Sequence, residues 1–294
     1  MLTYYIYDVF TDTPYAGNPL AVVEAADDLS TAQMQAIARE FNLSETIFIT
    51  APQGPVAEGE TRVAVRIFTP EHEMPFAGHP TVGCAVHLAG DVKGAQVITL
   101  EEVAGPTPVQ VTREGGDVRA EFVAPISPGV RDLPLDRDEI AQAVGLTAAD
   151  LGPHRAHITT GGHPFVHIQL ADRATLSRSA PGPGWARLAE VAGTGSVYLY
   201  TPGEAADFEA RMFSPGAIGE DPATGSATAL LSAQLLANGE LSDGTTTFRL
   251  CQGRDMGRLS HLELSVDVKG GQIDDVRVAG SAVQVARGQI APPA

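Results

Sequence analysis

The sequence has little lysine, little cysteine and no cluster with zinc spacing, and each shortage excludes a class of chemistry. Only two of the 19 basic residues are lysines, Lys93 and Lys269, and both stand beside glycine. Schiff-base and pyridoxal chemistry need a buried lysine, so they are disfavoured. Two cysteines, Cys84 and Cys251, are too few for a disulfide framework and are expected to be packed thiols. The four histidines in residues 154–167 are interrupted by Gly and Pro, so no metal site is expected.

Positive charge and long apolar runs are also scarce. Nineteen basic against 36 acidic residues give a net charge of −17, which repels nucleic acid and anionic lipid. The most apolar helical stretch, Ala227 to Ala237, is about half as long as a bilayer span. Residues 1–8 alternate like a first strand and lack the pattern of a signal peptide. We therefore expect a cytoplasmic protein that binds neither nucleic acid nor a membrane.

A duplication is the most informative feature that the sequence contains. Its 294 residues suggest two domains. Three blocks recur in the same order, and the pairs are Gly17-Asn-Pro19 with Gly162-His-Pro164, Arg66-Ile-Phe-Thr-Pro70 with Arg211-Met-Phe-Ser-Pro215, and His79-Pro-Thr-Val-Gly-Cys-Ala85 with Asp221-Pro-Ala-Thr-Gly-Ser-Ala227. The offsets are 162 − 17 = 145, 211 − 66 = 145 and 221 − 79 = 142, so the second copy is expected to lack three residues before the last block. Chance recurrence of Gly and Pro is the alternative, and ordered blocks at a nearly constant offset disfavour it.

The coarse pattern predicts an α+β fold with two similar halves, residues 1–125 and 126–281, joined by the Pro-rich segment 124–134. Short strands rich in Val, Ile and Tyr alternate with turns. A helix is expected at residues 31–40, and two more are expected at 80–88 and 223–237. The last two carry no formal charge on any face, which predicts helices buried on all sides. A strongly curved sheet around a central helix, once in each half, satisfies that requirement.

The starts of these two central helices are the expected binding site. Pro80 and Pro222 suit the first helical position, and His79 and Asp221 precede them. The unpaired amides of a first helical turn, together with the helix dipole, attract an anion. If the halves face each other about a pseudo-twofold axis, both helix starts converge on one cleft that could hold a small carboxylate.

The polar residues of the two copies differ in this region. The first copy offers His79, and the second offers Asp221 and Ser226, with Cys84 at the position matched to Ser226. A histidine and an aspartate brought together from opposite sides can bind or relay protons. Each could instead serve only as a helix-terminal structural residue. Their equivalence across the repeat favours the functional interpretation.

Glu45 is the third candidate. It lies in Asn42-Leu-Ser-Glu-Thr-Ile-Phe-Ile-Thr50, between a predicted helix end and an apolar strand. A carboxylate at the mouth of an apolar strand suits a general acid/base, whereas the alternative is an exposed loop acid. The second half has Gly195 at the matched position, so only one half would carry this group.

The run Phe68-Thr-Pro-Glu-His-Glu-Met-Pro-Phe-Ala-Gly-His-Pro-Thr-Val-Gly83 resembles the signature of the phenazine-biosynthesis PhzF-like isomerase family. The other segments that resemble the family are Ala16-Gly-Asn-Pro19, Asn42-Leu-Ser-Glu-Thr46, Phe213-Ser-Pro215, Asp221-Pro-Ala-Thr-Gly-Ser-Ala227, Gln252-Gly253 and Gly257-Arg258. The resemblance extends over essentially the whole chain. One departure is Leu259, where the family usually has Pro, and it affects a loop of the second half.

The resemblance implies the diaminopimelate epimerase-like fold, in which two pseudo-symmetric barrel-like domains enclose the active site between them. It implies that a last strand at about 282–290 returns to the first domain. Glu45 matches the proton-shuttling carboxylate of the family, and His79, Asp221 and Ser226 match polar residues around the substrate. The other residues expected to bind substrate at the helix starts are Gly78, Thr81 and Gly225. The resemblance also implies a homodimer and no cofactor.

The leading hypothesis is a cofactor-independent isomerase that moves a proton within a small carboxylate. Glu45 would take a proton from an activated carbon and return it elsewhere on the same face. An amino-acid or hydroxy-acid epimerase is the first alternative, although the paired thiols of the epimerase relatives are missing at the helix starts. The second alternative is a non-enzymatic ligand-binding or interaction protein on the same fold.

Overall fold

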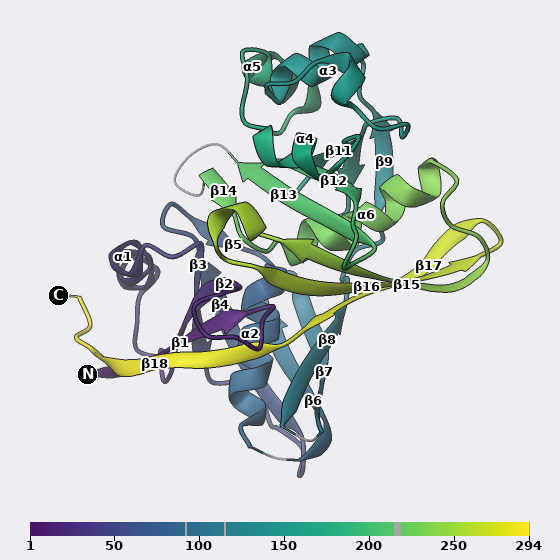
Figure 1. Cartoon of the computed structure of the whole chain (residues 1–294). Coiled ribbons are helices and arrows are strands. Elements are labelled where there is room, and N and C mark those ends of the chain that lie inside the picture. Colours follow the sequence, from purple (N-terminus) through teal and green to yellow (C-terminus); the bar gives the residue numbers. More distant parts are fainter. Residues whose placement is uncertain (92, 115, 215–218, 294) are drawn as a thin grey trace. The chain divides into compact units, whose positions relative to one another are not determined.

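The structure, a computed structural model, describes residues 1–91, 93–114, 116–214 and 219–293 (Figure 1). Pro215, which belongs to one of the repeated blocks, lies outside these ranges. The chain forms two compact units, one of Met1–Pro125 with Val278–Ala294 and one of Ile126–Arg277. The divisions follow residues 125 and 277, and the sequence led us to expect them after residues 125 and 281.

The first unit is built on a mixed sheet, which contains both parallel and antiparallel strand pairs. Its strands in chain order are β1 (Leu2–Val9), β2 (Asn18–Val23), β3 (Glu45–Thr50), β4 (Thr61–Phe68), β5 (Glu73–Met74), β6 (Gly94–Glu102), β7 (Gly105–Glu114), β8 (Asp117–Val123) and β18 (Ala282–Ile290). The sheet order is β18-β1-β2-β3-β4-β6-β7-β8, with β5 beside β4. The pairs β2–β3 and β4–β6 are parallel, and the others are antiparallel. The C-terminal strand β18 therefore pairs with β1, next to the beginning of the chain.

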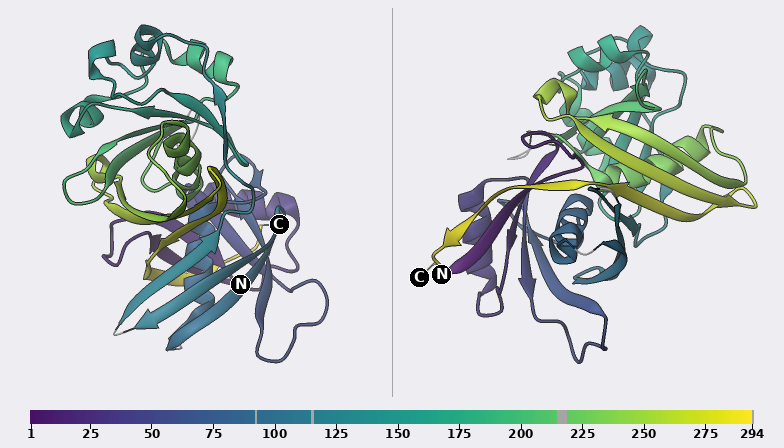
Figure 2. Two further views of the ribbon diagram at one scale, coloured as in Figure 1. Left: turned by 90° about the vertical axis from the view of Figure 1, so that its right-hand side faces the viewer. Right: turned by 60° about the horizontal axis from the view of Figure 1, so that its bottom comes forward.

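Helix α2 (Gly78–Ala89) is the centre of this unit, and the strands curve around it (Figure 2, right). Ten of its 12 residues are buried, in agreement with a composition that lacks any charged face. Gly83 explains how the helix approaches the sheet so closely. A Cβ at this position would lie 2.6 Å from Leu20 Cδ2 and 2.8 Å from Val9 Cγ2, so a larger residue would push α2 away from β1 and β2.

Helix α1 (Thr31–Phe41) covers the outer face of β3 and β4. A capping box between Ser30 and Gln33 starts it, and Asn42 ends it in the left-handed conformation. Met34 and Ile37 pack on Phe48 and form a small second core in this unit. The turn after Asn42 leads directly into β3, whose first residue is Glu45.

The second unit repeats this design. Its strands are β9 (Gly129–Asp132), β10 (His157–Thr160), β11 (Phe165–Gln169), β12 (Val197–Pro202), β13 (Phe208–Ser214), β14 (Gly219–Asp221), β15 (Gly244–Gln252), β16 (Ser260–Lys269) and most of β17 (Gln272–Gly280). The sheet order is β9-β10-β11-β12-β13-β15-β16, with β14 beside β13. The pairs β11–β12 and β13–β15 are parallel, at the same places as in the first unit. The Pro-rich segment 124–134 is not a bare linker, because it contains β9, which pairs with β10.

Helix α6 (Gly225–Ala237) is the counterpart of α2, and the left view in Figure 2 shows it within the strands of its unit. Three helices cover the outer face of the sheet, namely α3 (Arg137–Ala143), α4 (Arg173–Arg178) and α5 (Trp185–Ala192). They close a large core around Leu188, Val197 and Phe213. Two 3-10 turns, Ala148–Asp150 and Arg254–Met256, complete the unit. The α+β class with two similar halves is thus confirmed.

One ion pair recurs in both units and fixes the alignment of the repeat. Arg66 contacts Glu73 through two bonds of 2.7 and 2.6 Å, and its guanidinium lies 5.1 Å from the Phe68 ring. Arg211 makes the same pair of bonds to Glu220 at 2.7 and 2.8 Å and lies 4.7 Å from the Phe213 ring. The offset is 145 at the arginines and 220 − 73 = 147 at the glutamates. The second copy therefore gains two residues here.

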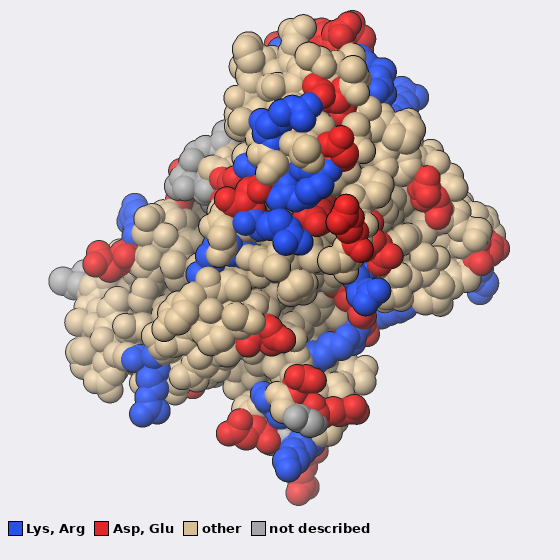
Figure 3. Space-filling model, viewed as in Figure 1, with Lys and Arg blue, Asp and Glu red and all other residues tan. Residues whose placement is uncertain are grey.

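Charges of both signs are interspersed on the face shown in Figure 3. In the second unit, part of the surface charge forms a network in which Arg173 and Arg254 contact Glu209, and Arg173 also contacts Asp255. Among the residues that the structure describes, no helix is long and apolar enough to cross a membrane.

Candidate functional site

Glu45 and His79 lie together in the first unit. Glu45 is the first residue of β3, and its register opposite Leu20 of the parallel strand β2 fixes its position. His79 is the second residue of α2. The Oε2 atom of Glu45 lies 3.0 Å from Nδ1 of His79, and the exposed fractions of the two side chains are 13% and 4%. Glu45 is therefore not the exposed loop acid of the alternative interpretation.

Some polar atoms of this pair make no hydrogen bond to the described part of the protein. The 3.0 Å contact lacks hydrogen-bond geometry, so Glu45 Oε2 has no hydrogen-bond partner among the described residues. His79 Nε2 and the hydroxyl of Thr46 are likewise buried and lack a partner within that part of the chain. Buried polar atoms without partners are rare in folded proteins and require an explanation. A ligand that hydrogen-bonds here would provide one.

The N-terminus of α2 adds two backbone amides to this region. The helix begins at Gly78, and its N-cap residue Ala77 has no side chain that could bond the first-turn amides. The amides of Gly78 and His79 therefore remain available to an anion. Asn18, at the start of β2, places its side-chain amide 3.4 Å from His79 Nδ1.

The side chain of Thr81 is buried and contacts other protein groups. Its hydroxyl is fully buried and lies 2.8 Å from the carbonyl oxygen of Ala77 and 2.7 Å from Glu102 Oε1. Its role in the structure is to join the first turn of α2 to the end of β6. It remains a predicted substrate-binding residue only through its backbone.

Asp221 and Ser226 lie in the second unit. Asp221 ends β14 and is 6% exposed, and Thr224 Oγ1 donates a 2.6 Å hydrogen bond to its carboxylate. Gln252 Nε2 donates to the backbone oxygen of Asp221 at 2.8 Å and to Thr224 Oγ1 at 3.0 Å. Gly225 and Ser226 are the first two residues of α6, whose N-cap side chain makes no capping bond to its helix. The second unit thus presents a buried carboxylate near an uncapped helix start.

The structure corrects how the two copies were matched. His79 is the second residue of α2, so its counterpart is Ser226, the second residue of α6, at an offset of 147. Asp221 lies in a strand four residues before α6, and its counterpart in β5 is Met74. Neither proline is the first helical residue, because Pro80 is the third residue of α2 and Pro222 precedes α6. Cys84 therefore does not match Ser226.

The counterpart of Glu45 is also corrected. Strand register aligns Thr46, opposite Phe68, with Val197, opposite Phe213. Glu45 then matches Ser196, one residue after the predicted Gly195. Ser196 Oγ lies 2.9 Å from His163 Nε2 and 3.2 Å from Ser214 Oγ, so the second unit has a different polar cluster here.

The predicted convergence of Glu45, His79 and Asp221 in one crevice involves both units. The structure brings Glu45 and His79 together within the first unit. The participation of Asp221 stays a prediction, and so does that of Ser226.

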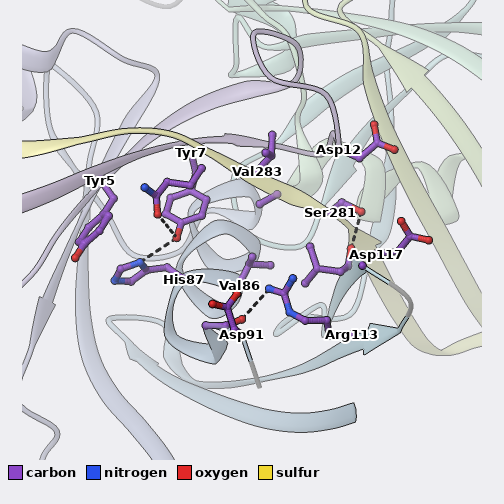
Figure 4. Close-up of a pocket in the computed structure, with 15 residues that line it drawn as sticks. Tyr5, Tyr7, Asp12, Val86, His87, Asp91, Arg113, Asp117, Ser281 and Val283 are labelled. Atoms are coloured by element: carbon purple, nitrogen blue, oxygen red, sulfur yellow. Dashed lines mark hydrogen bonds between the residues drawn. The ribbon is translucent and has the colours of Figure 1, made fainter. Parts of the chain in front are cut away.

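A cavity of about 590 Å³ lies elsewhere in the first unit, at the C-terminal end of α2 (Figure 4). None of the predicted site residues lines it. His87 reaches it from α2, with Nδ1 3.2 Å from the Tyr7 hydroxyl and Nε2 3.0 Å from Glu24. Burial lowers the pKa of His87 below its ordinary value, and the bond to Glu24 partly opposes that effect. The two ends of α2 thus carry two separate Glu–His contacts.

The four histidines of residues 154–167 serve separate contacts. His154 bonds Tyr200 and Glu240, whereas His157 bonds Gln234. No group of three or more candidate metal ligands occurs within residues 1–91, 93–114, 116–214 and 219–293. Cys84 and Cys251 are free and buried, as expected.

Sequence reasoning missed three residues of these regions, and two of them had a readable signal. Asn18 stands inside the repeated Gly-Asn-Pro block but received no role. Glu102 continues the inward alternation of Ile98 and Leu100 along β6, so its burial could have been predicted. Gln252 is the last residue of β15, as Glu102 is of β6, but its bonds to Asp221 and Thr224 depend on tertiary structure and have no local sequence signal.

Comparisons with known proteins agree on one family. The family model described as phenazine biosynthesis-like protein matches residues 7–288. An uncharacterized isomerase of Mesorhizobium japonicum is 40% identical over 98% of both chains. The trans-2,3-dihydro-3-hydroxyanthranilate isomerase of Pseudomonas fluorescens is 33% identical over 99% of both. Among solved structures, a PhzF-family phenazine biosynthesis protein of Bacillus anthracis covers 99% of both chains with a TM-score of 0.85 and 27% identity. The fold is thus the diaminopimelate epimerase-like fold expected from the sequence.

Proposed function

Because this chain belongs to the PhzF family and is an isomerase, we propose that it moves a proton within a small carboxylate-bearing substrate by general acid/base catalysis. Such a reaction breaks one C–H bond, shifts a pair of electrons through a double bond and forms another C–H bond. The formula and the oxidation state of the substrate do not change, so the reaction itself consumes no cofactor.

The contact between Glu45 and His79 is the observation that carries this proposal. Glu45 combines a nearly buried carboxylate with an oxygen that has no hydrogen-bond partner among the described residues. One carboxylate can take a proton as a base and return it as an acid, since the two steps use the same oxygen in turn. His79 would hold the carboxylate in place and stabilise the charge that it gains or loses.

The substrate carboxylate would bind at the helix starts. The uncapped amides of Gly78 in α2 and Gly225 in α6 favour an anion, and Ser226 can add a hydroxyl. Asp221 would contribute a second carboxylate for a proton or an amino group of the substrate. A partly reduced ring that bears a carboxylate fits these groups, as in the dihydro-3-hydroxyanthranilate for which the Pseudomonas fluorescens relative is named.

A matched pair of variants tests the role of Glu45. Glu45→Gln removes the acid/base group, and Glu24→Gln removes the other Glu–His contact of α2, which is also 3.0 Å long. With trans-2,3-dihydro-3-hydroxyanthranilate as the probe, we expect kcat to fall about 10²- to 10⁴-fold in Glu45→Gln and to stay near the wild-type value in Glu24→Gln. Equal kcat values in the two variants would refute the assignment.

The same assay separates the alternatives. An epimerase would return the starting skeleton with inverted configuration and solvent deuterium, whereas an isomerase shifts the double bond. A ligand-binding protein would bind the probe, but neither the wild type nor Glu45→Gln would convert it. Homodimer formation and a cytoplasmic location rest on the family resemblance and the composition alone. Sedimentation and cell fractionation test them.

A further inference from the structure

Glu102 is a buried carboxyl group that no step above uses. It is the last residue of β6 and is 7% exposed, and its Oε2 atom has no hydrogen-bond partner among the described residues. Its Oε1 atom lies 2.7 Å from the hydroxyl of Thr81, in the first turn of α2. That turn also carries His79, two residues before Thr81.

Counting protons at Thr81 shows which form of Glu102 fits. The Thr81 hydroxyl has one proton, yet two acceptors lie within bonding distance, the carbonyl oxygen of Ala77 at 2.8 Å and Glu102 Oε1 at 2.7 Å. If Glu102 is a carboxylate, only one of these two acceptors can receive the Thr81 proton, and the other is left without a hydrogen bond. If Glu102 is a neutral acid, it donates its own proton to Thr81, and Thr81 donates to Ala77. Only the neutral acid satisfies both contacts.

The surroundings of Glu102 also favour the neutral acid. Burial raises the pKa of Glu102 to about 8, and the bond to Thr81 opposes only part of that effect. Cys84 is the titratable group that faces it from α2, and burial keeps that thiol protonated by raising its pKa. The adjacent Glu101 is partly exposed and pairs with Arg62. No basic side chain forms an ion pair with Glu102 within the described part of the chain.

The second unit has a permanently neutral donor at the same place. Strand register matches Leu100, opposite Val63, with Leu250, opposite Phe208, so the counterpart of Glu102 is Gln252. Gln252 Nε2 donates to Thr224, and Thr224 donates to Asp221. In the second unit a neutral donor thus orients Thr224, the N-cap residue of α6.

We propose that Glu102 is a positioning residue, which as a neutral acid donates to Thr81 and thereby holds the first turn of α2 and His79 in place. When Glu102 ionises, its carboxylate takes the Thr81 proton, and Ala77 loses that bond. Ala77 directly precedes Gly78 and His79, so the change reaches the contact between His79 and Glu45. Only this last link rests on the proposed function.

Spectroscopy without any substrate tests the proposal. The protein is labelled with ¹³C at glutamate carboxyls and ¹⁵N in histidine rings and titrated as the full chain. We expect the carboxyl signal that is missing from Glu102→Gln to titrate near pH 8, and the His79 signals to shift at the same midpoint. In Glu102→Gln, whose amide can still donate to Thr81, that shift should be absent. His87, at the other end of α2, serves as the internal control. A Glu102 signal that titrates near 4.5, or His79 signals that ignore its titration, would overturn the proposal.

A kinetic test adds the functional link. With the same probe, the kcat of the wild type should fall above pH 8, and that of Glu102→Gln should keep its neutral-pH value there. Glu102→Leu, which cannot donate, should show a lower kcat at every pH. A wild-type pH profile identical to that of Glu102→Gln would refute the positioning role. If Glu45→Gln kept full turnover, the proposed function would fail, while the titration of Glu102 would still decide the present proposal.

Discussion

The two units of this chain have the same strand order and central helix but different polar groups at matched positions. Glu45 matches Ser196, His79 matches Ser226 and Glu102 matches Gln252, whereas the Arg66–Glu73 pair is repeated as Arg211–Glu220. The apolar framework and one ion pair thus follow from a shared fold. The polar residues that differ at matched positions are those for which we propose separate chemical roles.

Exchanging the acid/base position should give the largest effect. Glu45→Ser gives the first unit the residue that the second unit carries at that position, so it should lower kcat about 10²- to 10⁴-fold. Ser196→Ala should change kcat less than about threefold, because the Ser196 hydroxyl bonds His163 and Ser214 of its own unit. Steady-state kinetics on both variants checks this. A comparable loss in Ser196→Ala would mean that both units supply the acid/base chemistry.

The repeated arginine should matter more for stability in the second unit. Arg211 bonds Glu220 and also the backbone oxygens of Leu176, Ser177 and Ser179, and it is 11% exposed, compared with 28% for Arg66. Removing one partner of a buried pair costs about 3 to 5 kcal/mol, so Arg211→Ala should lower the free energy of unfolding by about 3 kcal/mol. Arg66→Ala should cost about 1 kcal/mol. Urea denaturation of both variants measures the difference, and equal losses would contradict the prediction.

Acid should destabilise the second unit through His167, whose counterpart in the first unit is Val22. Complete burial lowers the pKa of His167 to about 3, although its bond to the Ala227 carbonyl oxygen opposes the shift. The unfolded chain therefore binds a proton that the folded chain does not, and stability falls as the pH drops from about 6.5 towards 3. Between pH 6.5 and 5 the loss should be roughly 2 kcal/mol relative to His167→Gln. Denaturation at both pH values measures this loss. Equal losses in the wild type and in His167→Gln would refute the prediction.

The smallest predicted effect concerns Gln252. Gln252→Glu places a carboxyl group where an amide nitrogen donates to Asp221 and Thr224. Buried as Glu102 is, the introduced group is expected to be a neutral acid, whose single proton can replace only one of these two bonds, so the free energy of unfolding should fall by about 1 kcal/mol at neutral pH. The loss should grow as the pH rises and the introduced group ionises. An unchanged stability would show that these two bonds contribute nothing measurable.

The sequence predicted most of the fold because the apolar patterns are local. The charge-free runs identify the central helices, and the Arg-x-Phe blocks identify β4 and β13. The strand β9 was missed because four residues in a Pro-rich segment become a strand only by pairing with β10. The helix starts were misplaced because proline was taken as the first helical residue, whereas the chain turns into each helix at Gly78 and Gly225.

Part of the candidate site was readable in the same way. His79 and Glu45 stand in motifs with distinctive neighbours, and the structure brings them together. Glu102 was missed although its strand alternation indicated burial. Its importance depends on Thr81, which lies 21 residues earlier in the chain. Contacts of this kind follow from packing between elements and have no local sequence pattern.

The most direct test of the central claim is the fate of the proton that Glu45 is proposed to move. A substrate deuterated at the carbon that loses hydrogen is converted in ordinary water, and the deuterium content of the newly protonated carbon is measured by NMR. A single carboxylate that carries the proton on one face predicts measurable deuterium at the new position in the wild type, and no conversion in Glu45→Gln. Complete loss of the label to solvent, with protonation from the opposite face, would contradict the account.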